Sequence, residues 1–277
     1  MSKKQLIMEK AVELFSKQGF EATSVQQITD YCGISKGAFY LSFKSKDELI
    51  LALIDYYMQQ FSTELDYTVR NETKENTLYQ FFYKTFHAFS NHVEFARLLM
   101  KEQTYSLNEA LLDKMRYYDQ LTNETILTII EKVYGDAIND IKFDLILAIK
   151  GLLNSYSSLL LFNKVAFDEE LAAESLVEKT NILATYMSTP FITEEQGKMF
   201  QHFSVEDMSK EQLLSLMSSI ADDIEDSLEK DSLVLLKEQI DHTSFNLAII
   251  KGLIENIRAN KQCKWIAYLL EKHFNLL

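Results

Sequence analysis

The first 50 residues alternate helix-spaced apolar positions with polar residues that can cap helices. Apolar residues from Ile7 to Phe15 recur at the spacing of one helical face, which predicts a helix over residues 5–18. Gly19 follows as a candidate carboxy-terminal cap. The segment 24–27, Ser-Val-Gln-Gln, has the spacing of a capping box and opens a second helix. The pattern therefore predicts amphipathic helices joined by short turns.

Further capping signals predict two more helices in this segment. Gly33 and Ile34 interrupt the pattern, and Ser35 can cap a short third helix that runs to about Phe43. Residues 45–48, Ser-Lys-Asp-Glu, form a second capping box and open a fourth helix. Three short helices with a glycine-containing turn before the third describe a helix-turn-helix unit. The second helix of such a unit, which is the third helix of this chain, lies in the major groove of DNA.

Helical spacing continues from residue 51 to the end of the chain. Polar breaks divide residues 51–190 into helices, and these breaks lie near residues 71–76, 106–108, 135–140 and 163–168. Pro190 ends this region. Four further helical patterns follow, at about 209–229, 232–241, 244–259 and 262–275. We therefore predict three parts, which are residues 1–50, 51–190 and 191–277.

Composition supports an all-α fold. The chain has 7 Gly and 1 Pro among 277 residues, about 3% where average usage would give about 12%. Sandwiches, barrels and nucleotide-binding α/β folds need more glycine at their turns and phosphate loops. Cys32 and Cys263 fit neither a disulfide framework nor a zinc-ligand spacing, which favours a reducing compartment. The most apolar uncharged run, 151–163, is shorter than the roughly 20 residues of a membrane-spanning helix, so we expect a soluble, cytoplasmic protein.

The charge of the chain is unevenly distributed. The net charge of −13 argues against nucleic acid as a partner of the whole surface, because DNA is a polyanion. Residues 1–50, however, carry seven lysines against six acidic residues, a net charge of +1, which leaves −14 for residues 51–277. Only the first segment is therefore suited to approach a phosphate backbone.

The amino-terminal segment resembles the DNA-binding domain of the TetR family of bacterial transcriptional regulators. The resemblance covers about the first 50 residues and rests on Thr23-Ser-Val-Gln-Gln-Ile28, Gly33-Ile-Ser-Lys-Gly37, Phe39-Tyr40, Phe43 and Lys46-Asp-Glu-Leu49. It implies an all-α homodimer with a helical ligand-binding and dimerisation domain after the helix-turn-helix. The last two helices of that domain, Phe143–Phe162 and Glu169–Met187, would pair with a second subunit. The implied function is a ligand-responsive repressor that a small lipophilic effector releases from a palindromic operator in double-stranded DNA. Residues 191–277 would be an extension packed on the second domain or on the dimer partner.

The first turn of the third helix carries the residues best placed to read bases. Lys36 can donate to guanine acceptors, while the small Gly37 and Ala38 allow close approach or contact with a thymine methyl. Tyr40 and Lys46 are interpreted as phosphate contacts. A plain solvated lysine is the alternative for Lys36. The predicted DNA contacts are Thr23, Ser24, Gln26, Ser35, Lys36, Gly37, Ala38, Tyr40 and Lys46.

Two positions depart from the family pattern. Leu41 and Ser42 stand where many members have an aromatic residue followed by His or Arg, which weakens a phosphate contact there. Thr29 replaces a usual small Ala, a change that affects packing rather than function. Neither departure threatens the fold.

Seven aromatic residues lie between Tyr79 and Phe95, a density compatible with an apolar ligand pocket. Ordinary helical core is an equal alternative for each ring. The acidic balance of residues 51–190 favours a lipophilic cation as ligand, with a fatty acyl thioester as a second option. His87 and His92 are five residues apart, which is unsuited to one metal ion, so we predict no metal site. The predicted ligand contacts are Tyr79, Phe82, Tyr83, Phe86 and Phe89.

The sequence contains none of the catalytic motifs that we sought, among them a G-x-S-x-G elbow, an H-E-x-x-H zinc motif and a glycine-rich phosphate loop. We therefore predict a protein that is not an enzyme and needs no cofactor. An enzyme of unfamiliar all-helical type and an adaptor that keeps the fold without binding DNA are the two alternatives. Specific, salt-sensitive binding to a palindrome would separate the regulator from both.

Overall fold

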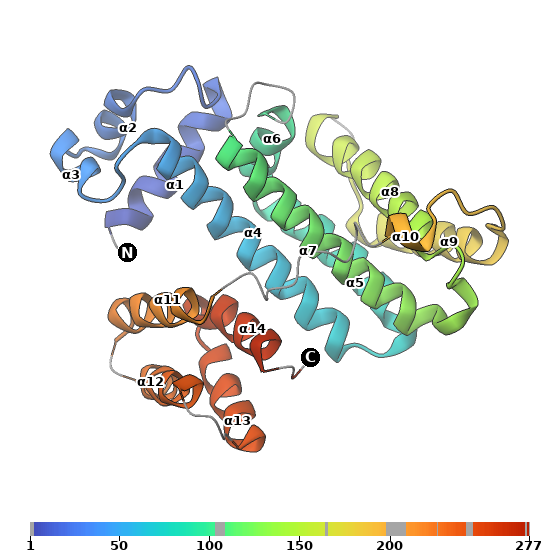
Figure 1. The fold of residues 1–277 in the computed structure, drawn as a ribbon. Coiled ribbons are helices and arrows are strands. Elements are labelled where there is room, and N and C mark those ends of the chain that lie inside the picture. Colours follow the sequence, from blue (N-terminus) through green and yellow to red (C-terminus); the bar gives the residue numbers. More distant parts are fainter. Residues whose placement is uncertain are drawn as a thin grey trace. The chain divides into compact units, whose positions relative to one another are not determined.

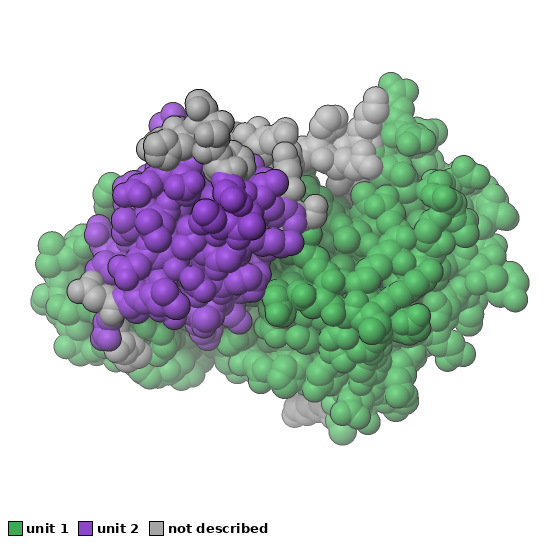
Figure 2. All heavy atoms as spheres, turned by 90° about the horizontal axis from the view of Figure 1, so that it is seen from below, with its two compact units in different colours: residues 1–201 green, residues 202–277 purple. Residues whose placement is uncertain are grey.

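The computed structural model describes residues 3–102, 109–163, 166–197, 209–225, 227–241, 246–274 and 276. Within these residues the regular elements are all helices, so the predicted all-α fold is confirmed. The chain forms two compact units, residues 1–201 and 202–277, which Figure 2 colours green and purple. The predicted break at residues 106–108 lies outside the described residues.

The first unit begins with three short helices and the start of a long one (Figure 1). These are α1 (Lys3–Gln18), α2 (Val25–Cys32), α3 (Lys36–Tyr40) and α4 (Lys46–Asn71). Their apolar faces meet in a common core, as the helical spacing predicts. The core consists of Ile7, Ala11, Phe15, Ile28, Phe39, Phe43, Leu49 and Leu53.

Glycines form the two tight turns of this bundle. Gly19 ends α1 with φ 86°, and Gly33 ends α2 with φ 67°. Residues other than glycine rarely adopt such positive φ angles. The third helix is shorter than predicted, because its regular part ends at Tyr40 and residues 41–42 form a turn before Phe43.

Five further helices form the body of the first unit among the described residues. They are α5 (Lys74–Asn91), α6 (Val93–Glu102), α7 (Glu109–Tyr134), α8 (Lys142–Phe162) and α9 (Glu169–Tyr186). Helix α5 packs against α4, α7, α8 and α9, and α6 packs against α1 and α8. A short 3₁₀ helix, Gly135–Ile138, occupies the predicted break between α7 and α8.

The chain beyond α9 stays with the first unit as far as Gly197. The backbone N–H of Ile192 donates to the Asp144 carboxylate at the start of α8, at 3.0 Å. Gly197 ends the short helix α10 (Glu194–Gly197), and a Cβ there would come within 2.0 Å of the Phe143 ring. The structure therefore divides the chain after residue 201 rather than at Pro190.

The described residues of the second unit form a bundle of four α-helices with its own core. Helices α11 (Lys210–Asp223), α12 (Leu228–Asp241) and α13 (Leu247–Arg258) are followed by a 3₁₀ turn (Lys261–Cys263) and α14 (Lys264–His273). Arg258 forms an ion pair with Glu271 between α13 and α14. The main buried apolar residues are Leu213, Met217, Leu233, Leu236, Ile250, Ile254, Ile257, Ile266, Leu269 and Leu270.

One helix boundary in this unit differs from the prediction. The predicted helix over 209–229 ends at Asp223, and the next residue, Ile224, is buried in an extended conformation. Ser227 then opens α12, because its hydroxyl accepts the N–H of Lys230 at 3.4 Å. The capping function of this serine was overlooked in the sequence.

Helix α8 is long and apolar enough to cross a membrane, a property that core helices of globular proteins share. It carries three charged residues, Lys142, Asp144 and Lys150. Its buried residues belong to the core of the first unit, and they include Phe143, Leu145, Ile146 and Ile149. The helix is therefore accounted for by packing within this unit.

Candidate nucleic-acid interface and ligand pocket

The outer surface of α3 presents a cation and an aromatic ring to solvent. Ser35 fixes the start of this helix, because its hydroxyl accepts the N–H of Ala38 at 3.2 Å. Lys36 and Gly37 follow and are exposed. Tyr40 is 52% exposed, and its ring packs edge-to-face on buried Phe39. This first turn has the character of a helix end that enters the major groove.

The start of α2 adds polar groups beside α3. Ser24 forms the predicted capping box with Gln27, with its hydroxyl accepting the Gln27 N–H at 3.2 Å and its own N–H donating to the Gln27 side chain at 2.8 Å. Gln26 is exposed, and its amide donates to Asp30 at 2.6 Å. Both Ser24 and Gln26 remain accessible at this surface.

Two of the predicted DNA contacts are engaged inside the protein. Thr23 is 0% exposed, and its hydroxyl donates to the carbonyl of Gly19 at 2.8 Å, so this side chain is not available to a phosphate. The Lys46 ammonium donates to the carbonyls of Phe20 at 2.7 Å and Glu21 at 3.3 Å. The Lys46 side chain thus joins the start of α4 to the turn after α1.

Two further residues that the sequence did not single out as contacts, Lys44 and Leu41, are exposed at the end of α3. Lys44 is exposed just beyond α3. The Glu48 carboxylate accepts the backbone N–H of Lys44 at 2.5 Å, rather than that of Ser45 as the predicted capping box would require. Leu41 is 89% exposed at the end of α3. In the sequence, the positive charge of Lys44 in the loop directly after α3 is the feature that could have identified it as a candidate DNA contact.

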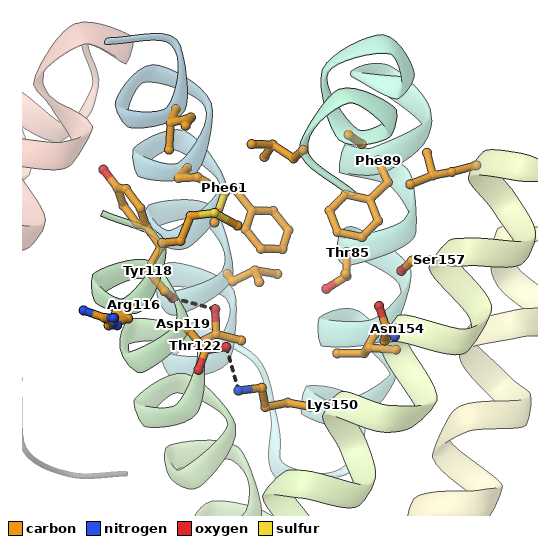
Figure 3. A pocket seen from close by; sticks show the side chains of 18 of the residues that line it. Phe61, Thr85, Phe89, Arg116, Tyr118, Asp119, Thr122, Lys150, Asn154 and Ser157 are labelled. Carbon is orange, nitrogen blue, oxygen red and sulfur yellow. Dashed lines mark hydrogen bonds and ion pairs between the residues drawn. The ribbon is translucent and has the colours of Figure 1, made fainter. Parts of the chain in front are cut away.

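A cavity of about 580 Å³ lies among α4, α5, α6, α7 and α8. Figure 3 shows side chains from these helices converging on it. Its volume falls within the usual range for small-molecule pockets. Its apolar lining is formed by Ile54, Met58, Phe61, Leu65, Phe81, Phe89, Ala96, Leu99, Leu112, Met115, Leu153 and Leu161.

Helix α5 directs only one of its faces into the cavity. Phe81, Thr85 and Phe89 line the cavity and are spaced four residues apart, which places them on one helical face. Of the five predicted ligand contacts, only Phe89 belongs to this lining. The others, Tyr79, Phe82, Tyr83 and Phe86, lie outside it.

The remaining rings of α5 lie on its other faces and pack in or against the core of the first unit. Phe82 and Phe86 are 0% exposed in the core. The Phe86 ring lies 5.2 Å from that of Phe167. Tyr79 and Tyr83 stack on each other along a third face, with ring centres 6.0 Å apart. For these residues the alternative of ordinary helical packing is the better description.

The polar lining of the cavity includes two cations and one carboxylate. Arg116 and Asp119 come from α7, and Lys150 comes from α8. The Lys150 ammonium donates to Asp119 at 2.6 Å. The acidic balance of residues 51–190 is therefore not reproduced in the cavity, and the lining gives no support to a cationic ligand.

Long-range polar contacts hold the walls of the cavity together. The Tyr118 hydroxyl donates to Asp55 on α4 at 2.7 Å, and Lys114 pairs with the same carboxylate at 2.9 Å. Burial, together with the adjacent Asp55 carboxylate, raises the pKa of Tyr118. Arg97 on α6 donates to the carbonyl of Leu161 on α8 at 2.6 Å. Helices that are distant in sequence are thereby joined around the cavity.

The two histidines of interest have separate surroundings. His87 lies 3.0 Å from Glu169, while the His92 ring packs against Tyr57. Among the residues that the structure describes, no group of three or more His, Cys, Asp and Glu side chains is arranged to hold a metal ion.

Comparisons with known sequences match both the recognition helices and the full chain. Residues 7–53 match the family described as bacterial regulatory proteins, tetR family. The uncharacterized HTH-type transcriptional regulator YerO of Bacillus subtilis (strain 168) is 28% identical over 92% of this chain and 89% of its own length. A second regulator of that kind from the same strain, YuxN, is 26% identical over 98% of each chain. The likeness to YuxN thus includes the second unit.

A comparison with solved structures supports the same fold. The crystal structure of a TetR/AcrR-family transcriptional regulator from Aquifex aeolicus VF5 aligns with a TM-score of 0.52 at 23% identity. The alignment covers 99% of that chain and 66% of this one. About a third of this chain therefore has no counterpart in that structure.

Proposed function

We propose that this chain, a transcriptional regulator of the TetR family with an amino-terminal DNA-binding domain, is a homodimeric repressor that a small lipophilic molecule releases from DNA. The exposed first turn of α3 would enter the major groove of a palindromic operator. The cavity among α4 to α8 would receive the effector. We place the protein in the cytoplasm, where its operator would be.

The observation that carries this proposal is that α4 runs without a break from the core of the first three helices to the cavity. Its first turns bury Leu49 and Leu53 in the core of the recognition helices. Its next turns supply Ile54, Met58 and Phe61 to the cavity. Since one helix of 26 residues belongs to both sites, a ligand that displaces its middle also moves its beginning.

A second connection runs through α6. This helix packs on α1 of the recognition bundle and contributes Ala96 and Leu99 to the cavity. A ligand that favours a different position of α4 or α6 would change the separation of the two recognition helices in a dimer. By linkage, operator binding must then weaken ligand binding by the same factor.

The roles of individual residues at the DNA follow from their exposure. We assign base reading to Lys36, with Gly37 allowing close approach. Ser24, Tyr40 and Lys44 would contact phosphates, which set the register of the protein on DNA. Gln26, Ser35 and Ala38 also lie at this surface, with Gln26 within reach of a base edge.

Homodimerisation is supported by exposed apolar side chains on the last two long helices. Leu147, Leu159 and Phe162 on α8 are 43–44% exposed. Leu171 and Ile182 on α9 are 62% and 49% exposed. Exposed apolar residues gathered on neighbouring helices mark an association surface. A charged substitution, Leu159→Lys, should therefore convert the dimer to a monomer in analytical ultracentrifugation.

The second unit has its own core, and we assign it a role in dimer stability or ligand access rather than in base reading. Removing residues 202–277 should weaken the association of the dimer or change effector binding. The DNA sequence preferred by the remaining dimer should stay the same. A truncated protein that is dimeric and normally inducible would contradict this role.

Selection of bound sequences from random DNA with the purified full chain tests DNA recognition. We expect a palindrome, with affinity that falls steeply as salt rises. Lys36→Ala should lower affinity for the palindrome by about 1–3 kcal/mol and leave affinity for random DNA nearly unchanged. Equal losses on both DNAs would contradict base reading. A folded protein that selects no sequence would instead favour the adaptor or enzyme alternatives.

A further inference from the structure

The cavity is chemically divided along its length. In Figure 3, Phe61 and Phe89 lie at one end, while Asp119 and Lys150 lie at the other, and the Arg116 side chain points away from the cavity. A molecule that fills this cavity would meet aromatic surface with one part and charged groups with the other. The cavity is thus shaped for an amphipathic ligand.

The charged end is organised around Lys150. Its ammonium donates to Asp119 at 2.6 Å and to the side-chain oxygen of Asn123 at 2.8 Å. Asn123 is buried, whereas the Asp119 side chain is 56% exposed. Because Asp119 keeps much of its contact with water, it is the partner that can leave Lys150 at the smaller cost. Asn123 would stay in place.

One face of α8 carries further polar groups into the cavity. Asn154 and Ser157 follow Lys150 by four and seven residues and therefore lie on the same side of the helix. The Ser157 side chain is 3% exposed, and its hydroxyl has no hydrogen-bond partner among the described residues. A buried hydroxyl without a partner costs free energy. In Figure 3 this hydroxyl lies beside Phe89, away from Lys150, so it belongs to the aromatic end of the cavity rather than to the charged end.

We propose that the ligand of this cavity is an anionic amphiphile whose negatively charged end replaces Asp119 at the Lys150 ammonium. Its apolar body lies against Phe61 and Phe89. The sign of the charge follows from Lys150, whose carboxylate partner Asp119 is 56% exposed, because the exposed Arg116 is already paired with Asp113 at 2.7 Å. This inference specifies the ligand class at the effector cavity and rests on the proposed function for that site.

The exchange at Lys150 has a structural consequence. The pair of Lys150 and Asp119 joins α8 to α7. The residue before Asp119 is Tyr118, which holds α7 to α4 through Asp55. When the anion takes over Lys150, α7 loses the Asp119 tie to α8 but keeps the hydrogen bond of Asn123 to Lys150 and its tie to α4. The signal is thereby delivered to the helix that reaches the DNA-binding domain.

Three probes with the same ten-carbon chain test the charge preference. Binding of decanoate, decanol and decyltrimethylammonium to the full-length protein is measured by isothermal titration calorimetry below micelle-forming concentrations. We expect decanoate to bind most tightly. Lys150→Met should weaken decanoate binding at least about tenfold, the loss of one charge-assisted hydrogen bond, and leave decanol binding unchanged. Asp119→Asn should tighten decanoate binding several-fold, because the competing charge is removed.

Matched variants separate the specific effect from a change in overall charge or folding. Lys84→Met removes a positive charge of α5 outside the cavity and should bind decanoate like the unmodified protein. Lys150→Arg keeps the charge and should retain decanoate binding. Circular dichroism and unfolding midpoints identify variants that are not folded, in which case Lys150→Arg and Asp119→Asn still decide the question.

The inference is overturned if the cationic probe binds best, if decanoate does not bind, or if Lys150→Met affects all three probes alike. Release of the selected palindrome is measured with the same probes by fluorescence anisotropy. Decanoate that binds through Lys150 without releasing DNA would contradict the proposed effector function and support the ligand class. Release by decanol without decanoate binding would support the function and contradict the ligand class.

Discussion

The recognition surface and the cavity belong to one unit and share α4, but different interactions hold them in place. At the recognition surface, Ser24, Ser35 and Ser45 each cap a helix through a residue three positions ahead. Around the cavity, Tyr118 and Asp55 are 63 residues apart in sequence and meet through one hydrogen bond. The first site is specified locally, whereas the second depends on how whole helices pack. Substitutions of exposed residues at the first site should therefore act mainly on DNA affinity, whereas substitutions around the cavity should act on stability and ligand binding.

The strongest test of this difference is Phe82→Ala. Phe82 is 0% exposed in the core beside the cavity, and removing its ring should destabilise the protein by about 3–5 kcal/mol. Phe89 lines the cavity and is only half-buried, so Phe89→Ala should cost less stability and change ligand binding instead. Urea unfolding of both variants measures the costs. A smaller loss for Phe82→Ala than for Phe89→Ala would contradict the assignment of these two faces.

The same difference explains what the sequence could predict. The helices of the recognition bundle follow from nearby residues, such as Ser24 with Gln27 and Gly33 with its left-handed turn, and their boundaries are correct to within a few residues. Helix α5 was predicted as aromatic-rich, but its rings point in three directions. Which direction meets a cavity depends on the positions of α7 and α8, which residues within α5 do not encode.

The sequence also does not show which polar side chains are engaged within the protein. The spacing of Lys46 and Thr23 in the family motif suggests DNA contacts, yet both side chains are held by carbonyls of the turn after α1. In the second unit, an unrecognised cap at Ser227 moved the boundary between α11 and α12. Polar residues can serve the fold or a partner, and only their hydrogen-bond partners distinguish the two.

Alkaline pH should sharpen the contrast, because α7, which lines the cavity, also carries two half-buried tyrosines, Tyr117 and Tyr134. Burial, with smaller contributions from the Glu124 and Asp55 carboxylates, raises the pKa of Tyr117 to about 12. Burial also raises the pKa of Tyr134 to about 12. Their pKa in the unfolded chain is about 10. Above pH 10 the unfolded state loses these protons first, so stability that is fully present below pH 10 decreases as the pH rises towards 12.

The expected loss is about 1.4 kcal/mol per pH unit for each tyrosine while only the unfolded state is ionised. Urea unfolding at pH 9 and pH 11 measures it. Lysines titrate in the same range, so the comparison is with Tyr117→Phe, which should lose less stability between the two pH values. The same pH dependence in this variant would show that Tyr117 does not contribute.

Lys46→Met tests the positioning role on the recognition side. The variant loses the hydrogen bonds to the Phe20 and Glu21 carbonyls, and we expect a loss of about 1 kcal/mol in stability. Lys44→Met is the matched control, since Lys44 is exposed. It should leave stability unchanged and reduce the slope of the salt dependence of DNA binding by about one. A Lys46→Met protein of unchanged stability would return Lys46 to the phosphate contacts.

Leu41→Ala should hardly change the free energy of unfolding, and it should change operator affinity through a single base contact. Leu41 is 89% exposed, so its truncation should change the free energy of unfolding by less than about 0.5 kcal/mol. An exposed leucine at the end of the recognition helix is suited to contact a thymine methyl group. Leu228→Ala, at a residue 64% exposed in the second unit, is the control and should leave operator affinity unchanged.

Replacing thymine by uracil in the selected operator tests that contact atom by atom, because it removes only the methyl group. If Leu41 packs on one thymine methyl, uracil at that position should weaken binding of the unmodified protein about as much as Leu41→Ala does. The two changes together should then cost no more than either alone, since they delete the same contact. Losses that add at every thymine position would mean that Leu41 faces solvent in the complex as well. The recognition surface would in that case read bases through its polar residues alone.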